Sequence, residues 1–208
     1  HYKTHANENL RIAASTIPGE YILPGLLKAF KQAHAQIHTK VYISDSNEVI
    51  DKVISGSICL GIIGYQPDHP DLDISYFASD CLKLVCAADE PLHGGVDLMA
   101  LTKETLIMRE EGSGTRAVTL DYLKQNGCPL DRLQNYPVFG STKSSLSAIE
   151  SGLGIGWLSE SAIKDALKLG HIRVLSDAYD IPRPLYFIQY KKRKLSPSAA
   201  AFKRFVTL

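Results

Sequence analysis

Short runs of apolar residues alternate with segments of helical periodicity along most of this chain. The first half contains the runs LRIAAS (10–15), KVYIS (40–44) and ICLGIIG (58–64), separated by two segments whose apolar residues recur every three or four positions. Strands that are apolar along nearly their whole length are typical of a parallel sheet covered by helices on both faces. The first half therefore predicts a β-α-β-α-β unit, and the fold class is α/β.

The same alternation begins again after DEPLHGG (89–95), whose proline and glycines indicate a crossing or a hinge. Before that hinge, LDISYF (72–77) and CLKLVCAA (81–88) predict two successive strands with no helix between them. After it, strands alternate with helices until the strand LYFIQY (185–190) and a terminal helix close the chain. Two α/β lobes are therefore expected, and in open α/β sheets ligands bind where strands end and helices begin.

Charge and hydropathy exclude several classes of protein. The 208 residues include 23 basic and 22 acidic residues, so a net charge of +1 gives no general attraction to nucleic acid or to an anionic membrane. The basic run KKRK (191–194) lies between a predicted strand and a predicted helix, and we interpret it as a solvated connector. The apolar runs are far shorter than the roughly 18 to 20 residues that cross a bilayer, and the polar start lacks the apolar centre of a signal peptide. No contact with a membrane is expected.

The four cysteines, Cys59, Cys81, Cys86 and Cys128, show no CxxC spacing. Two of them lie in predicted strands where a small apolar side chain suffices, so free thiols are expected rather than disulfides. This favours a reducing compartment, and the cytoplasm is the predicted location.

Four strand-to-helix turns carry small hydroxyl residues: ASTIPG (14–19), SDSNE (44–48), EGSGTR (111–116) and GSTKSS (140–145). At a helix N-terminus the first backbone N–H groups lack partners and the helix dipole is positive, so such a turn can bind an anion. Serine and threonine are also the usual N-caps, which explains any single turn equally well. Four turns together, two from each lobe, favour an anion site.

The turn at 111–116 gives the strongest signal for a ligand. Gly112 and Gly114 let backbone N–H groups approach a bound group closely, and Arg116 adds a permanent cation with a forked set of donors. Adjacent residues of an extended segment point in opposite directions. Of the preceding acids Glu110 and Glu111, one is therefore expected in solvent while the other orients the turn.

The sequence lacks the common motifs for nucleotide binding, catalysis and metal binding. The turn at 111–116 has neither the spacing nor the lysine of a P-loop, and GLGIGW (152–157) leaves a predicted helix to enter a strand, opposite to a dinucleotide fingerprint. There is no GxSxG turn, and the seven histidines show no HExxH or similar spacing. We therefore predict no catalytic residue, no metal and no cofactor, and we assign Trp157 to the core.

Four segments carry a resemblance to a known family: LRIAASTIPGEYILPGLLKAF (10–30), VYISDSNEVIDKVISGSICLGIIG (41–64), REEGSGTR (109–116) and SGLGIGWLSESAI (151–163). From about residue 9 to its C-terminus, the chain resembles the effector-binding domain of LysR-type transcriptional regulators. The STIPG and EEGSGTR turns most resemble the branch of that family associated with sulfur and selenium metabolism.

The resemblance implies a periplasmic-binding-protein-like fold of type 2, in which two Rossmann-like lobes are joined by two crossing strands. It implies a discontinuous lobe I at 1–88 and 184–208, and a lobe II at 89–183. It also implies a small anionic effector, either an inorganic oxyanion or a small carboxylate, in the cleft between the lobes. The effector-binding residues that match the family are Ser15, Thr16, Ser44, Ser113, Gly114, Thr115, Arg116, Ser141 and Thr142.

Regulators of this family begin with a winged helix-turn-helix domain, for which this sequence has no counterpart. We therefore interpret the chain as the sensor of a regulator, which would reach promoter DNA only through that further domain. The resemblance also implies a homodimer or tetramer, paired through helices of the two lobes. The alternative is a periplasmic solute-binding protein for an oxyanion in ABC transport, which would use the same fold and a similar turn. An enzyme with this two-lobed fold is the third interpretation.

Overall fold

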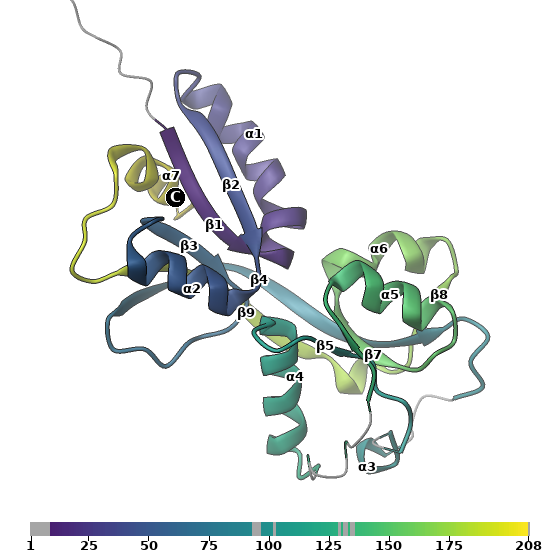
Figure 1. The fold of residues 1–208 in the computed structure, drawn as a ribbon. Coiled ribbons are helices and arrows are strands. Elements are labelled where there is room, and N and C mark those ends of the chain that lie inside the picture. Colours follow the sequence, from purple (N-terminus) through teal and green to yellow (C-terminus); the bar gives the residue numbers. More distant parts are fainter. Residues whose placement is uncertain are drawn as a thin grey trace, which may run out of the picture. The chain divides into compact units, whose positions relative to one another are not determined.

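The computed structural model describes residues 9–92, 97–101, 103–128, 130, 133 and 136–207. The chain divides into two compact units: unit 1 is His1–Ala78 with Pro184–Leu208, and unit 2 is Ser79–Arg183. It passes from unit 1 to unit 2 within β4 (Leu72–Ala87) and returns within β9 (Ile181–Tyr190), as Figure 1 shows. The first passage comes earlier than residue 88, where the sequence placed the boundary. Residues 93–95 of the expected hinge lie outside the described residues.

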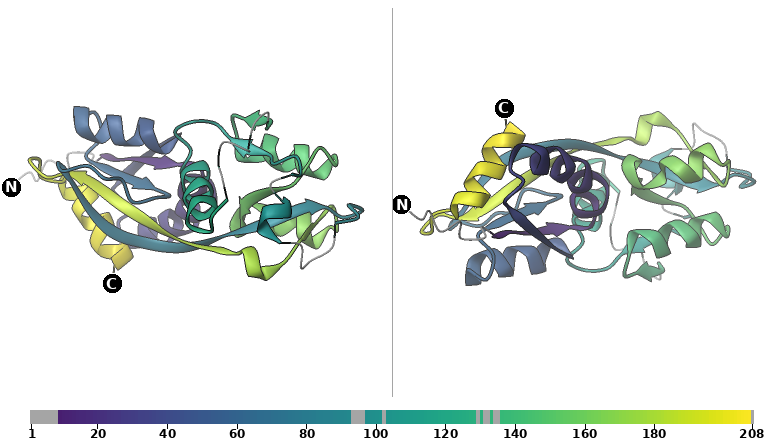
Figure 2. Two further views of the ribbon diagram at one scale, coloured as in Figure 1. Left: turned by 90° about the horizontal axis from the view of Figure 1, so that it is seen from below. Right: turned by 90° about the horizontal axis from the view of Figure 1, so that it is seen from above.

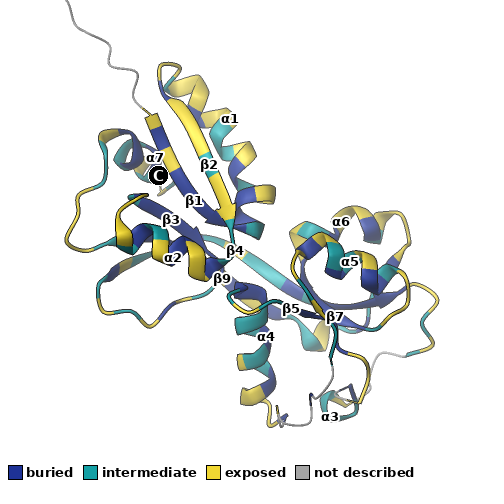
Figure 3. Ribbon diagram, viewed as in Figure 1, coloured by how far each residue is buried: buried dark blue, intermediate teal, exposed yellow. Residues whose placement is uncertain are grey.

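Unit 1 is built on β1 (Asn9–Ser15), which pairs in parallel with β2 (His38–Ser44) on one side and with β3 (Leu60–Ile63) on the other. The expected β-α-β-α-β unit is therefore confirmed, and β9 extends this sheet antiparallel to β3. The register of β1 and β2 places Ser15 beside Ser44, so the carboxyl ends of these strands meet at one end of the sheet. β2 is an edge strand and is largely exposed (Figure 3).

Helices cover both faces of the sheet in unit 1 (Figure 2). On one face, α1 (Leu23–Ala33) and α7 (Pro197–Thr207) pack on β1 through aromatic side chains. The rings of Phe30 and Phe202 lie 5.2 Å apart, edge to face. On the other face lies α2 (Ser46–Ser55). Because successive residues of a strand point to opposite faces and both faces are covered, β1 is buried without alternation from Ile12 to Ser15.

Unit 2 contains a mixed arrangement of short strands. Both β7 (Gly156–Ser159) and β8 (Ile172–Val174) pair antiparallel with β4. β5 (Met108–Arg109) pairs in parallel with β6 (Val138–Phe139), and a parallel bridge just before β5 connects it to the segment that enters β7. The expectation of a parallel sheet is therefore correct for the pairs β1–β2, β1–β3 and β5–β6. It is wrong for β7, β8 and β9, which pair antiparallel with their neighbours.

The helices of unit 2 also pack on two faces. One core cluster joins α4 (Gly114–Gln125) to β4 and β7, and another joins α5 (Thr142–Glu150) and α6 (Glu160–Lys168) to the opposite side of those strands. Trp157 is buried, and its indole N–H donates to the carbonyl oxygen of Tyr179 at 2.8 Å, which confirms its place in the core. The short helices of unit 2 are α3 (Leu98–Leu101) and η3 (Asp177–Tyr179), and unit 1 has one short helix, η1 (Pro18–Ile22).

The two strands expected at 72–77 and 81–88 form one continuous strand, β4. The two expected strands are separated by residues 78–80, and the charged Asp80 at the end of this stretch interrupts the apolar pattern. In the structure the Asp80 carboxylate accepts a hydrogen bond from Ser159 Oγ at 2.8 Å and pairs with Arg183. A buried acid with two such partners does not break a strand.

The cysteine side chains agree with the sequence analysis. All four cysteines are free, as expected. In the part of the chain that the structure describes, no helix is long and apolar enough to cross a membrane.

Candidate functional site

The turn between β5 and α4 leaves a helix N-terminus open. Gly112 has a φ of +88°, a left-handed conformation that glycine adopts without strain. Ser113 is the N-cap of α4, yet its side chain makes no capping hydrogen bond. The first hydrogen bond of the helix runs from the amide of Ala117 to the carbonyl oxygen of Ser113. The N–H groups of the first turn, including those of Gly114 and Thr115, therefore have no side-chain cap.

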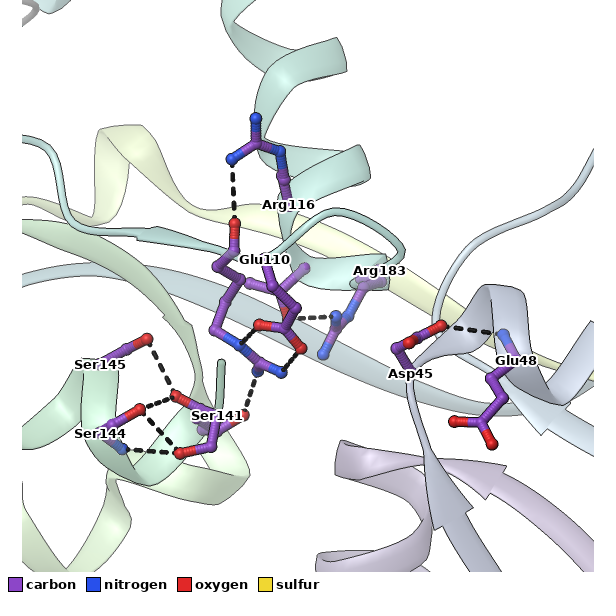
Figure 4. Close-up of polar contacts among 11 residues, drawn as sticks. Asp45, Glu48, Glu110, Arg116, Ser141, Ser144, Ser145 and Arg183 are labelled. Atoms are coloured by element: carbon purple, nitrogen blue, oxygen red, sulfur yellow. Dashed lines mark hydrogen bonds and ion pairs between the residues drawn. The ribbon is translucent and has the colours of Figure 1, made fainter. Parts of the chain in front are cut away.

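The N-terminus of α5 is capped by its own serines. Ser141 Oγ accepts from the amide of Ser144 at 3.0 Å, while Ser144 Oγ and Ser145 Oγ both donate to the carbonyl oxygen of Ser141 (Figure 4). Ser141 is exposed, whereas Thr142 is 3% exposed. Of the two effector-binding residues expected here, Ser141 thus serves as the helix cap and Thr142 lies inside the unit.

Two buried arginines that the sequence analysis did not single out contact the threonines of these turns. Arg109 is 5% exposed and Arg183 is 3% exposed. Arg183 Nη1 donates to Thr115 Oγ1 at 3.0 Å, and Arg109 Nη1 donates to Thr142 Oγ1. A sequence signal existed for Arg109, which directly follows the apolar residues LIM (106–108), because charged residues are rarely buried without a partner. Arg183 lies between two prolines, before the strand expected at 185–190, and gave no such signal.

Each guanidinium group has a carboxylate of its own. Nε and Nη2 of Arg109 each donate to a different oxygen of Glu110, both at 2.7 Å. Nε of Arg183 donates to Asp80 Oδ2 at 3.1 Å, and its Nη2 contacts the same oxygen. Glu111 is exposed, as expected for one of the two acids, whereas the Glu110 carboxylate pairs with the neighbouring Arg109 and not with the glycine turn.

Burial and charge act in opposite directions on Arg183. Removal from water lowers the pKa of this guanidinium, and the Asp80 carboxylate acts to raise it. The positive charge of Arg109 acts in the same direction as burial, which places the two guanidinium groups within each other's field.

Arg116, expected as an effector ligand, is engaged within unit 2. Its Nη1 donates to the carbonyl oxygen of Arg109 at 3.0 Å (Figure 4), and its Nη2 donates to the hydroxyl of Tyr136 at 2.9 Å. The guanidinium carbon lies 5.3 Å from the centre of the Tyr136 ring. Side chains on a helix tilt toward its N-terminus, so an arginine in the first turn reaches back to the preceding strand. Arg116 therefore braces α4 against β5.

In unit 1, the expected residues lie where β1 and β2 end. Ser15 is 7% exposed, and Ser44 Oγ is buried without a hydrogen-bond partner in the described part of the chain. Thr16 is partly exposed and begins the helical segment that continues as η1. The N-cap of η1, Ile17, provides no side-chain cap. The first turn of unit 1 thus resembles the turn before α4 in leaving its amides open.

The second turn of unit 1 is different, because an acid occupies the helix N-terminus. Asp45 is the N-cap of α2, and its Oδ1 accepts from the amide of Glu48 at 2.9 Å (Figure 4). A carboxylate at this position takes the donors that an anion would use. Over the described ranges, no group of three His, Cys, Asp or Glu side chains is placed to hold a metal ion.

Comparison with known proteins identifies the class of protein to which this fold and these turns belong. The family model described as "LysR substrate binding domain" matches residues 3–207. The chain therefore belongs to this family and is an effector-binding domain of a LysR-type transcriptional regulator, not an enzyme. The periplasmic-binding-protein-like fold is confirmed as well.

Individual relatives and a solved structure show the extent of the similarity. The chain is 34% identical over 198 residues to the "Phosphonates import ATP-binding protein PhnC" of Anaeromyxobacter dehalogenans, covering 92% of this chain and 39% of that protein. It is 30% identical over 201 residues to the "Uncharacterized HTH-type transcriptional regulator MJ0300" of Methanocaldococcus jannaschii, covering 95% of this chain and 68% of the regulator. The regulatory domain of CcmR from Synechocystis PCC6803, solved in complex with 2-PG, matches with a TM-score of 0.82 at 25% identity, over 96% of this chain and 95% of that one. This chain thus spans only part of the length of its curated relatives.

Proposed function

We propose that the chain binds a small anionic effector and, within a full-length regulator, controls DNA binding and transcription. The observation that carries the proposal is the pair of buried threonine hydroxyls, Thr115 and Thr142, in the first turns of two helices of unit 2, each held by a guanidinium group. Helix N-termini and hydroxyl groups donate to anionic oxygens. An inorganic oxyanion or a small carboxylate has the acceptors for such donors.

We propose that both units contribute to the site. The contacts from unit 1 are the hydroxyls of Ser15, Thr16 and Ser44. The contacts from unit 2 are Ser113, Thr115, Thr142 and the backbone N–H of Gly114, while Ser141 and Arg116 support them as cap and brace. A ligand that touches both units favours one arrangement of them, to the extent that it binds the alternatives unequally. The 2-PG complex of the CcmR domain supports a small-molecule effector.

We propose that promoter DNA is bound by an N-terminal helix-turn-helix domain, that the regulator is a homodimer or tetramer, and that it works in the cytoplasm. A net charge of +1 is consistent with a sensor that leaves DNA binding to another domain. The encoded residues before His1 test this directly. A helix-turn-helix pattern there supports the regulator, and a signal peptide would instead support a solute-binding protein.

The experiment is a thermal-shift screen of sulfate, thiosulfate, selenate, phosphate and small amino-acid derivatives, followed by calorimetry with the best ligand. We expect Thr115→Val and Thr16→Ala each to weaken binding by about tenfold, because each removes one hydrogen bond to a charged group. Ser147→Ala, on the exposed side of α5, is the control and should leave the affinity unchanged. Unchanged affinity in both site variants would disprove this site.

A further inference from the structure

A groove lies in unit 1, between α1 and the segment that leads from this helix into β2. Its volume is about 520 Å³, within the range of roughly 300–1,000 Å³ that is usual for sites of small molecules. The residues that line it all lie between positions 24 and 39, so the groove belongs to unit 1 alone. It shares no residue with the proposed effector site.

One wall of the groove is a single face of α1. Pro24, Leu27, Lys28 and Lys31 follow the i, i+3, i+4, i+7 spacing that places helical residues in one row. At a spacing of three residues the Cβ atoms of Lys28 and Lys31 are about 5–6 Å apart. Both ammonium groups can therefore reach the same bound group.

The opposite wall is the turn that ends α1 and begins β2. The amide of Ile37 donates to the carbonyl oxygen of His34 at 3.0 Å, and the Ile37 side chain is buried in the core of unit 1. Ala35 contributes only a methyl group, so the turn leaves space beside the helix. Leu27 packs partly buried against the same core, and together with Ile37 it gives the groove an apolar surface.

The ionisable side chains of the groove are all bases: Lys28, Lys31 and His38. The three are exposed, and none of them pairs with a carboxylate in the part of the chain that the structure describes. The His38 ring offers an N–H donor in both of its protonation states. Because the chain as a whole has a net charge of only +1, the groove gathers positive charge that the chain as a whole lacks.

We infer that this groove is a second ligand site, for a small organic dianion such as a phosphate monoester. Its apolar part lies on Leu27 and Ile37, and its charged group binds Lys28 and Lys31. An inorganic anion would leave the apolar surface in water, and a neutral hydrocarbon would leave the lysines without a partner. The inference goes beyond the proposed function, because the proposed effector binds at other residues.

Probes that carry different parts of such a ligand test the inference. At about pH 7.5 phenyl phosphate has a ring and close to two negative charges, benzenesulfonate has the ring and one charge, and inorganic phosphate has no ring. Binding is followed by the backbone amide shifts of Leu27, Lys31 and Ile37 in ¹⁵N-labelled protein, so weak binding is measurable. We expect saturable shifts with phenyl phosphate, and an affinity about tenfold or more above that of either other probe. Equal affinities for the three probes, or no saturable shift at these amides with phenyl phosphate, would overturn the inference.

Substitution of the two lysines gives a second test. Lys28→Gln with Lys31→Gln removes both charges and keeps residues of similar length and helix propensity. The affinity for phenyl phosphate should fall about tenfold, and the weakening of binding by added salt should nearly disappear. Lys164→Gln with Lys168→Gln, which removes two exposed charges from α6 in unit 2, is the matched control and should change neither quantity. An unchanged affinity in the groove variant, or an equal loss in the control, contradicts the inference.

The alternative occupant is an acidic side chain of a second copy of this chain. In that case phenyl phosphate would not bind, and Lys28→Gln with Lys31→Gln would lower the mass measured by sedimentation equilibrium. This result would overturn the inference, whereas binding of phenyl phosphate at an unchanged mass supports it. Neither result bears on the proposed effector site, which is tested separately through Thr115 and Thr16.

Discussion

At the scale of single residues, the buried pair of Asp80 and Arg183 should contribute strongly to stability. Their side chains are 1% and 2% exposed, so removing one charge leaves the other without a partner in the core. Asp80→Asn should lower the free energy of unfolding by about 3–5 kcal/mol. The exposed pair of Glu48 and Lys52 on α2 is the control, and Glu48→Gln should cost about 0.5 kcal/mol or less. Urea unfolding of the two variants measures both values, and similar small losses would show that the buried pair is not coupled to folding.

The buried thiols should be unreactive in the folded protein. Burial raises the pKa of Cys86 and of Cys128, so little of either is present as the reactive thiolate at about pH 8. We expect their alkylation by iodoacetamide, followed by mass spectrometry, to be more than about tenfold slower than after denaturation. The raised pKa also makes the stability depend on pH, because the folded protein holds each thiol in its neutral form. Keeping these thiols neutral stabilises the fold fully below their unfolded pKa, and this stabilisation is lost as the pH rises through their folded pKa. Fast alkylation of both thiols without denaturant would contradict their burial.

The residues of the candidate site were only partly predictable from the sequence. The hydroxyls of Thr115 and Thr142 followed from the turn pattern, because helix N-termini combine these residue types with open amides. Arg109 and Arg183 were missed, because the threonines that they contact, and the acid that pairs with Arg183, lie far along the chain: Arg183 and Asp80 are 103 positions apart, and Arg109 and Thr142 are 33 apart. Arg116 was the visible cation, yet its donors go to a carbonyl oxygen and a tyrosine. Contacts between segments that are distant in sequence therefore decide which arginine lies beside each threonine hydroxyl.

At the scale of elements, hydrophobic periodicity predicted the parallel strands and main helices but not the length of β4. A stretch such as Ala78–Asp80 looks like a break because its polar atoms need partners. Those partners come from β7 and β9, elements far along the chain. Short strands such as β5 and β6 also carry little periodicity of their own, so their pairing depends on the segments around them.

Two glycines should respond to alanine in opposite directions. A Cβ at Gly154 would lie 2.1 Å from the carbonyl oxygen of Thr105, where the segment entering β7 passes close to the chain before β5. Gly154→Ala should therefore lower the free energy of unfolding by about 1–3 kcal/mol. A Cβ at Gly25 in α1 would meet no atom within 4 Å, and Gly25→Ala should stabilise by about 0.5–1 kcal/mol through its higher helix propensity. Thermal and urea unfolding at equal protein concentration measure the two changes, and the same sign in both would refute the packing argument.

At the scale of the whole molecule, self-association through unit 1 is the expected behaviour. β2 is an edge strand that exposes Tyr42 and Ile43, and Tyr21 of η1 is also exposed, at 37%, 46% and 42% respectively. Edge strands with exposed apolar side chains tend to pair with another chain. Sedimentation equilibrium should therefore give twice the mass of the single chain at high concentration, and Ile43→Lys should shift the equilibrium toward the monomer while the circular dichroism stays the same. Leu153→Lys, at an exposed apolar residue of unit 2, controls for a general effect of added charge. A chain that stays monomeric at the highest soluble concentration would contradict the expectation, and an equal effect of both substitutions would show that the contact does not depend on β2.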